Sequence, residues 1–190
     1  MSVELFTLPV SPGYAVPVRW FHAHGSNGAA IVLMPALGIP ARYYDPLATA
    51  LQAAGTSVLV MEQRGHGDSS LRPSRSVDFG YREVLDEDIP ALLAWLDQHQ
   101  PGQPVVLMGH SLGGHYASMT AGRSPERIAG VILSACGTAC FEAFEGKVRH
   151  QLRVLIMMIP LLTRAFGYYP GEKVGFGGRE ARRLMHDWLQ

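Results

Sequence analysis

The sequence PVVLMGHSLGG at residues 104–114 joins a short apolar run to a serine that has a glycine two residues away on each side. Its middle has the form Gly-x-Ser-x-Gly, a pattern frequent enough by chance that its context decides its meaning. An apolar run typical of a buried strand precedes it, and a helix rich in small residues, 112–122, follows it. A strand–turn–helix unit of this kind lifts the serine hydroxyl clear of the sheet. We therefore expect Ser111 to be a nucleophile, with a helix N-cap as the simpler alternative.

The residues next to Ser111 are expected to shape the turn and to supply an oxyanion donor. Gly109, His110 and Gly113 form the predicted nucleophile elbow, in which the two glycines allow close packing and the His110 side chain points away from the nucleophile. Leu112 opens the helix, where backbone N–H groups lack an intrahelical acceptor. We expect the Leu112 N–H to face an oxyanion that develops on a substrate.

The rest of the chain repeats the alternation of strand and helix. Apolar runs without polar alternation are typical of parallel strands covered on both faces. Periodic apolar positions predict the helices between them, and Pro90 predicts a kink or a late start in the second helix. We expect an α/β fold, a mostly parallel sheet flanked by helices. The expected strands are 3–8, 16–24, 29–34, 56–61, 104–108 and 128–134, and the expected helices are 44–54, 84–96 and 112–122.

Composition narrows the class of protein. The 190 residues include 16 Lys+Arg and 16 Asp+Glu, so there is no electrostatic case for nucleic acid or an anionic membrane. At 47% hydrophobic and 17% charged residues, the chain is expected to be a soluble globular protein. Residues 1–9 do not resemble a secretory signal and the apolar run 154–162 is too short to span a bilayer, so we expect a cytoplasmic location. The two cysteines, Cys136 and Cys140, are expected to be buried thiols rather than a metal site.

Four segments together resemble the α/β-hydrolase superfamily, in the branch near serine aminopeptidases and monoacylglycerol lipases. They are LMPALG (33–38), RGHGDS (64–69), GHSLGG (109–114) and SPERIAGVIL (124–133). The resemblance implies a serine hydrolase that acts on a small-molecule ester, thioester or amide through Ser111, with no cofactor. It also implies that the loop after the third strand supplies a second oxyanion donor, which the alignment of Pro35-Ala36-Leu37 assigns to the Leu37 N–H.

The same resemblance divides the chain and leaves part of the catalytic machinery unassigned. It implies a hydrolase core over residues 1–140 and the start of a helical cap over 141–190. It ends before the strands that would carry the catalytic acid and histidine, so no residue is matched to either. The strand at 128–134 would then be an exposed edge, and we expect self-association or a complementing chain there. Two alternatives stay open: a non-catalytic scaffold that serves as a binding module, and an acyltransferase that uses the same elbow.

Several other polar residues are expected to have no part in catalysis. His110, His115, His150 and His186 are not expected to be the base, and His186 with Asp187 is interpreted as an exposed polar pair. His66 and the strand-end histidines, His22 and His24, are expected to be loop and surface residues. Arg179, Arg182 and Arg183 are expected on a solvated face of an amphipathic helix over 179–190.

Overall fold

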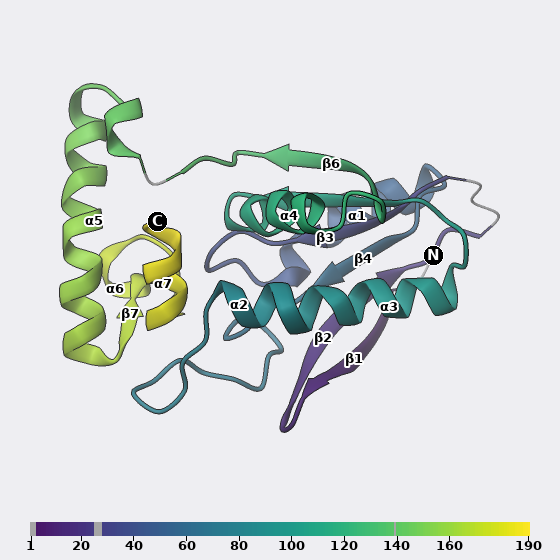
Figure 1. The fold of residues 1–190 in the computed structure, drawn as a ribbon, viewed down its shortest axis with the longest axis horizontal. Coiled ribbons are helices and arrows are strands. Elements are labelled where there is room, and N and C mark those ends of the chain that lie inside the picture. The colour runs from purple at the N-terminus through teal and green to yellow at the C-terminus, as the bar shows by residue number, and fades with distance from the viewer. Residues whose placement is uncertain (1–2, 25–27, 139) are drawn as a thin grey trace.

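A computed structural model describes residues 3–24, 28–138 and 140–190. A central sheet forms the body of the molecule (Figure 1), and six of the described strands make it up. The predicted order, two strands followed by four that helices separate, is confirmed. The strands are β1 (Glu4–Ser11), β2 (Tyr14–Phe21), β3 (Ala30–Met34), β4 (Val58–Met61), β5 (Val105–His110) and β6 (Ile128–Ser134).

The order of the strands brings the functional loops together. The sheet runs β1-β2-β4-β3-β5-β6, with β1 and β2 antiparallel to their neighbours and the other four strands parallel. The carboxyl ends of parallel strands meet at one edge of the sheet, and ligands of open α/β sheets bind beside that edge. Met34, the last residue of β3, pairs in register with Gly109 of β5. The loop after β3 and the turn after β5 therefore begin side by side.

Helices cover the two faces of the sheet unequally. Beside the 3₁₀ turn Ala41–Tyr44, α1 (Asp45–Ala53) packs on one face, while α3 (Ile89–His99) and α4 (Leu112–Arg123) pack on the other. A short helix, α2 (Tyr81–Glu83), leads through a π-helical turn, Val84–Asp88, into α3. Pro90 lacks an N–H that could continue the helical hydrogen bonds. Just before it, the Ile89 N–H bonds to the Val84 carbonyl, so this helical turn contains one residue more than an α-helical turn. Of the two alternatives predicted for Pro90, the late helix start is confirmed, because α3 begins at Ile89 with Pro90 in its first turn.

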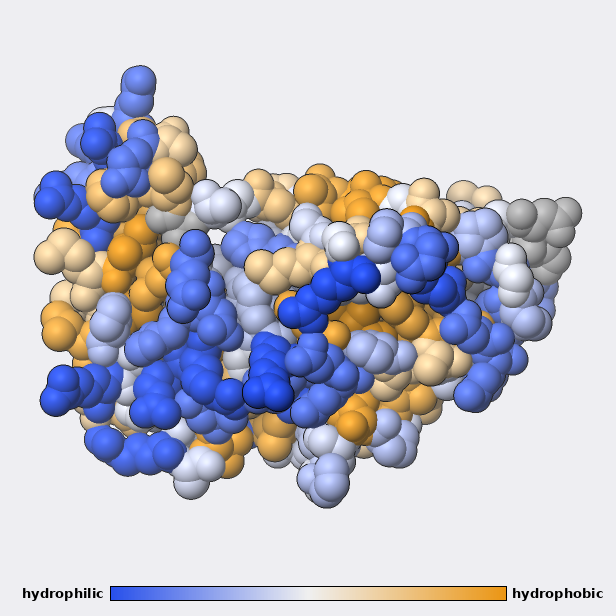
Figure 2. Space-filling model, in the orientation of Figure 1, coloured by the Kyte–Doolittle hydropathy of each residue, from blue (hydrophilic) through white to orange (hydrophobic). Residues whose placement is uncertain are grey.

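Strand β6 is an edge with exposed apolar side chains, as the sequence predicts. Among the described strands it pairs with β5 alone, and the exposed fractions of Val131, Ile132 and Leu133 are 39%, 43% and 53%. Hydrophobic surface gathers over β6 along the upper margin of Figure 2. Unpaired backbone groups and apolar side chains therefore lie open together on this side of the sheet.

The chain after β6 forms a separate layer beside the sheet. It consists of η3 (Phe141–Ala143), α5 (Gly146–Phe166), β7 (Tyr168–Pro170), α6 (Gly171–Val174), β8 (Arg179–Ala181) and α7 (Arg182–Trp188). The predicted helical character is right for α5 and α7, but α7 begins at Arg182 rather than at 179. Residues 179–181 instead pair with 168–170 as two short antiparallel strands. Such short strands contain no apolar run, so the sequence pattern missed them.

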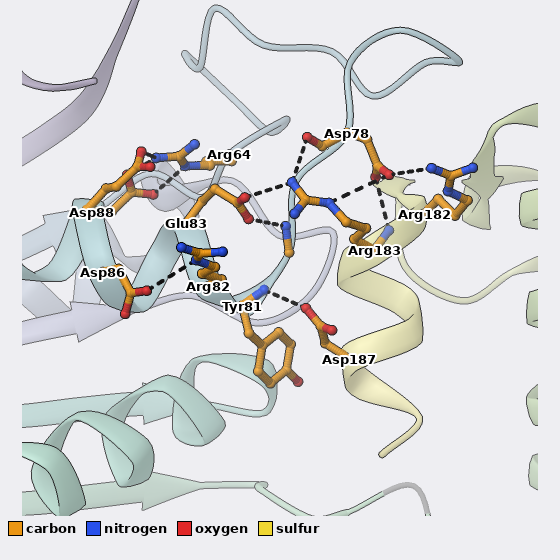
Figure 3. A network of polar contacts seen from close by, with 12 residues as sticks. Arg64, Asp78, Tyr81, Arg82, Glu83, Asp86, Asp88, Arg182, Arg183 and Asp187 are labelled. Carbon is orange, nitrogen blue, oxygen red and sulfur yellow. Dashed lines mark hydrogen bonds and ion pairs between the residues drawn. The ribbon is translucent and has the colours of Figure 1, made fainter. Parts of the chain in front are cut away.

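Charged contacts fasten this layer to the loop before α2, as Figure 3 shows. Asp78 accepts hydrogen bonds from the Arg182 guanidinium and from the Arg183 N–H, both at 3.0 Å. Arg183 also pairs with Glu83 at 2.7 Å, and the Asp187 carboxylate accepts the Tyr81 N–H at 2.7 Å. Arg182 and Arg183 are exposed on α7, as predicted for a solvated helix face, and they also contribute to the docking of α7. Asp187 likewise binds α2 rather than pairing with His186.

No helix among residues 3–24, 28–138 and 140–190 combines the length and the hydropathy that crossing a bilayer demands.

Candidate active site

Ser111 has a backbone conformation that serine rarely adopts. Its φ is 52° and its ψ is −115°, between the end of β5 and the first residue of α4. Its N–H donates to the Ser134 carbonyl at 2.9 Å, and its carbonyl accepts the Gly114 N–H at 2.9 Å. Residues held in sparsely populated backbone regions concentrate at functional sites, where the surrounding structure maintains the strain.

The Ser111 side chain has no role in capping the helix. Ser111 occupies the N-cap position of α4, yet its hydroxyl makes no capping hydrogen bond. Within the part of the chain that the structure describes, no side-chain hydrogen bond involves Ser111 Oγ. The helix-cap alternative therefore fails, and the half-buried hydroxyl is free for other chemistry.

The two glycines of the elbow are required by close packing. A Cβ at Gly109 would lie 2.3 Å from the Gly113 carbonyl oxygen, and a Cβ at Gly113 would lie 2.0 Å from the Met34 carbonyl oxygen. Neither approach leaves room for a side chain. The second contact also presses the start of α4 against the end of β3 and so brings the elbow to the loop that begins at Pro35.

The loop after β3 is fixed by hydrogen bonds that leave the Leu37 and Gly38 N–H groups without an acceptor among the described residues. Gln63 Nε2 donates to the Pro35 carbonyl at 2.5 Å, and the Ile39 N–H donates to the Ala36 carbonyl at 3.1 Å. Among the described residues, the Leu37 N–H has no hydrogen-bond partner. Leu112 is the first residue of α4, so its N–H has no intrahelical acceptor either. The Leu37 and Leu112 N–H groups thus lack an acceptor in the loop after β3 and at the start of α4.

Tyr44 joins this loop to the elbow. The Ala36 N–H donates to Tyr44 Oη at 2.8 Å, and Tyr44 Oη lies 2.8 Å from His110 Nδ1. Burial raises the pKa of Tyr44 despite the Ala36 N–H, and the tautomer of His110 decides which group donates in the bond between them. His110 Nδ1 is occupied by this bond, which agrees with the expectation that its ring is not directed at the nucleophile.

The remaining candidate histidines are engaged elsewhere or lie on the surface. His115 lies 2.8 Å from the Tyr81 hydroxyl on one side and 2.8 Å from the Gly137 carbonyl on the other. The ring of His186 bonds to Thr163 Oγ1 at 3.1 Å, and His150 is exposed on α5. Among the described residues, none of these imidazoles bonds to Ser111, so the structure shows no base for it.

Sequence reasoning misplaced His66 and the cysteines. His66 is buried, and its Nε2 lies 2.8 Å from the fully buried carboxylate of Glu180. The glycines on both sides of His66 were the available signal of tight packing. Cys136 is only half-buried and Cys140 is exposed, so the expectation of two buried thiols is also wrong. Arg179 donates to the Pro73 carbonyl at 2.6 Å rather than facing solvent.

Comparison with known proteins identifies the family of the chain. The model of the family described as serine aminopeptidase, S33, matches residues 25–170. Human monoglyceride lipase is 30% identical over 115 residues, which cover 60% of this chain and 37% of the lipase. The acetyltransferase component of the acetoin cleaving system of Pseudomonas putida is 32% identical over 118 residues, or 62% of this chain and 30% of that protein. The chain thus spans about a third of the length of these curated relatives.

Solved structures extend the likeness of fold to the whole chain. The crystal structure of a soluble variant of monoglyceride lipase from Saccharomyces cerevisiae superposes with a TM-score of 0.73 and 20% sequence identity. The superposition covers 100% of this chain and 68% of the lipase chain. Fold and elbow define an α/β-hydrolase. Within that superfamily, the chain belongs to the serine aminopeptidase S33 family.

Proposed function

We propose that this chain carries the nucleophile and the oxyanion hole of a serine hydrolase of the lipase or esterase type. The observation that supports the proposal best is the strained Ser111, with φ at 52° and a hydroxyl that caps no helix. The substrate would be a small molecule with an ester, thioester or amide bond, as the family and the monoglyceride lipase relatives suggest. Residues 1–140 would form the catalytic core and residues 141–190 the beginning of a cap.

The chemistry follows from the positions of these groups. Ser111 Oγ attacks the carbonyl carbon of the substrate, a base removes the hydroxyl proton, and the carbonyl electron pair moves onto its oxygen. The Leu37 and Leu112 N–H groups donate to that oxyanion. When the oxyanion collapses, the leaving group departs with the proton from the base, and water later hydrolyses the acyl-serine. No histidine among the described residues bonds to Ser111, so the base is assigned to none of them.

An esterase assay with a matched control tests this proposal. We expect Ser111→Ala to lower the hydrolysis rate of an activated ester roughly 1,000-fold, since the nucleophile is lost. Ser118→Ala is the control, because Ser118 is an exposed serine of the same helix and should keep the wild-type rate. Equal rates for wild type and Ser111→Ala would remove Ser111 from the mechanism.

We also propose that the β6 edge binds a second copy of the chain or a complementing segment, since apolar side chains and unpaired backbone lie open there. Size-exclusion chromatography should show wild type above its 20.7 kDa mass, and Ile132→Lys should shift it toward a monomer. Leu47→Lys replaces a leucine of similar exposure, 39%, on α1 and should leave the elution unchanged. A compact wild-type monomer would contradict this proposal.

A further inference from the structure

A glycine segment of the C-terminal layer lies directly on the loop that holds the proposed oxyanion donor. A Cβ at Gly38 would lie 2.6 Å from the Gly178 nitrogen and 3.0 Å from Gly177 Cα. The two backbones therefore touch with no side chain between them. Residues distant in the sequence, 37–38 and 177–178, thus form one packed unit at the carboxyl edge of the sheet.

The Leu37 side chain is held by the same layer. Leu37 packs against the main core and also against a second cluster formed by Ile159, Tyr169 and Met185. A Cβ at Gly177 would lie 3.1 Å from Leu37 Cδ2, so even a methyl group at that position would push on Leu37. The position of the Leu37 backbone therefore depends on the C-terminal layer as well as on the sheet.

Glu180 holds the segment of Gly177 and Gly178 in place through its carboxylate. Its Oε1 accepts the Gly178 N–H at 2.7 Å, and its Oε2 lies 2.8 Å from His66 Nε2. Glu180 is fully buried, so its two partners compensate the cost of removing a carboxylate from water. Since His66 belongs to the loop after β4, the carboxylate ties the glycine segment to the carboxyl edge of the sheet. A Cβ at Gly178 would lie 3.0 Å from His66 Cε1, which shows how closely the two pack.

We propose that Glu180, held by His66, is a positioning residue that keeps Gly177 and Gly178 against Leu37 and so aims the Leu37 N–H at the oxyanion. The inference rests on the proposed function, because it assigns Leu37 as a donor. An oxyanion donor acts only within a narrow range of distance and direction, so a support for its backbone affects catalysis without touching the substrate.

The kinetic test compares two glycines of one loop. Gly177 and Gly175 have similar φ values, 71° and 78°, but a Cβ at Gly175 would meet nothing within 4 Å. We expect Gly177→Ala and Glu180→Ala to slow the reaction of Ser111 with a fluorophosphonate about 10-fold or more, as displacement of a donor should. Gly175→Ala should react within about 2-fold of wild type. Glu180→Gln should restore most of the rate, because its amide oxygen can still accept the Gly178 N–H.

A second test measures the structure of the loop and does not depend on activity. Hydrogen exchange should be about 10-fold faster at the Ala36 and Ile39 amides in Gly177→Ala than in Gly175→Ala, because both are hydrogen-bonded amides of the supported loop. Thermal unfolding shows whether each variant folds. If Glu180→Ala does not fold, the test is made with Gly177→Ala and Glu180→Gln instead. Equal exchange and equal labelling in the two glycine variants would overturn the positioning role. If wild type does not label at Ser111, the proposed function fails, and exchange alone decides whether Glu180 supports the loop.

Discussion

Ser111 concentrates strain at a single residue, and that strain has a measurable consequence. Glycine adopts a φ of 52° without the steric cost that a Cβ brings. We expect Ser111→Gly to raise the free energy of unfolding by about 1 kcal/mol, while Ser111→Ala should leave it nearly unchanged. Urea unfolding of the three proteins measures the difference. A destabilised Ser111→Gly would mean that the serine side chain, and not the backbone, determines the energy of the turn.

Residues differ in how far the sequence alone predicts their roles. Ser111 was predictable because the residues that shape its turn are its neighbours in the chain, and two of them are glycines with an unambiguous steric reason. His66 was not, because its partner Glu180 is 114 positions away and arrives through a C-terminal layer with no diagnostic pattern. Buried polar pairs between distant segments leave no local signal.

Among the elements, the attachment of α7 depends on the charges around Asp78. Asp78 receives hydrogen bonds from both Arg182 and Arg183 and is only 16% exposed, whereas the two arginine side chains are about half exposed. We expect Asp78→Ala to lower the free energy of unfolding by about 1 kcal/mol, after allowing for solvent screening of the arginines. It should also speed tryptic cleavage after residues 182 and 183.

The control for this substitution is Asp97→Ala, because Asp97 pairs with Arg127 away from the C-terminal layer. Added salt should speed the cleavage in wild type but have less effect in Asp78→Ala, since screening weakens a pair that the variant has already lost. Cleavage at the same rate in wild type, Asp78→Ala and Asp97→Ala would show that α7 is held by its apolar contacts alone.

The strands of the central sheet and the helices that cover it were predictable to within a few residues, because the strands are apolar runs and the helices have periodic apolar positions. The short strands β7 and β8 were not, since their pairing depends on how the chain folds back after α5. The range of strand β6 was predictable from its sequence, but its exposure depends on the rest of the sheet. Its sequence is that of a buried strand, and its exposure follows from the absence of a further partner among the described residues.

At the scale of the whole molecule, stability should depend on pH through His66. Burial lowers the pKa of His66, but the hydrogen bond and charge of Glu180, with Glu62 nearby, outweigh burial and the repulsion of Arg72, so the pKa rises above its ordinary 6.5. The folded state then binds a proton more tightly than the unfolded chain. This contribution is fully present below pH 6.5 and is lost as the pH rises through the folded pKa.

Urea midpoints measured from pH 6 to pH 9 test that dependence. Wild type should lose stability across this range more steeply than His66→Gln, in which the titrating group is absent. Parallel curves for the two proteins would show that His66 does not gain a proton on folding.

The most direct measurement is the intact mass of the folded chain after reaction with a fluorophosphonate, with Ser111→Ala alongside. The proposed active site predicts one added phosphonyl group in wild type and none in Ser111→Ala, because Ser111 is the proposed nucleophile and its half-buried hydroxyl caps no helix. No adduct on folded wild type, or the same adduct on both proteins, would contradict the assignment of Ser111 as the nucleophile.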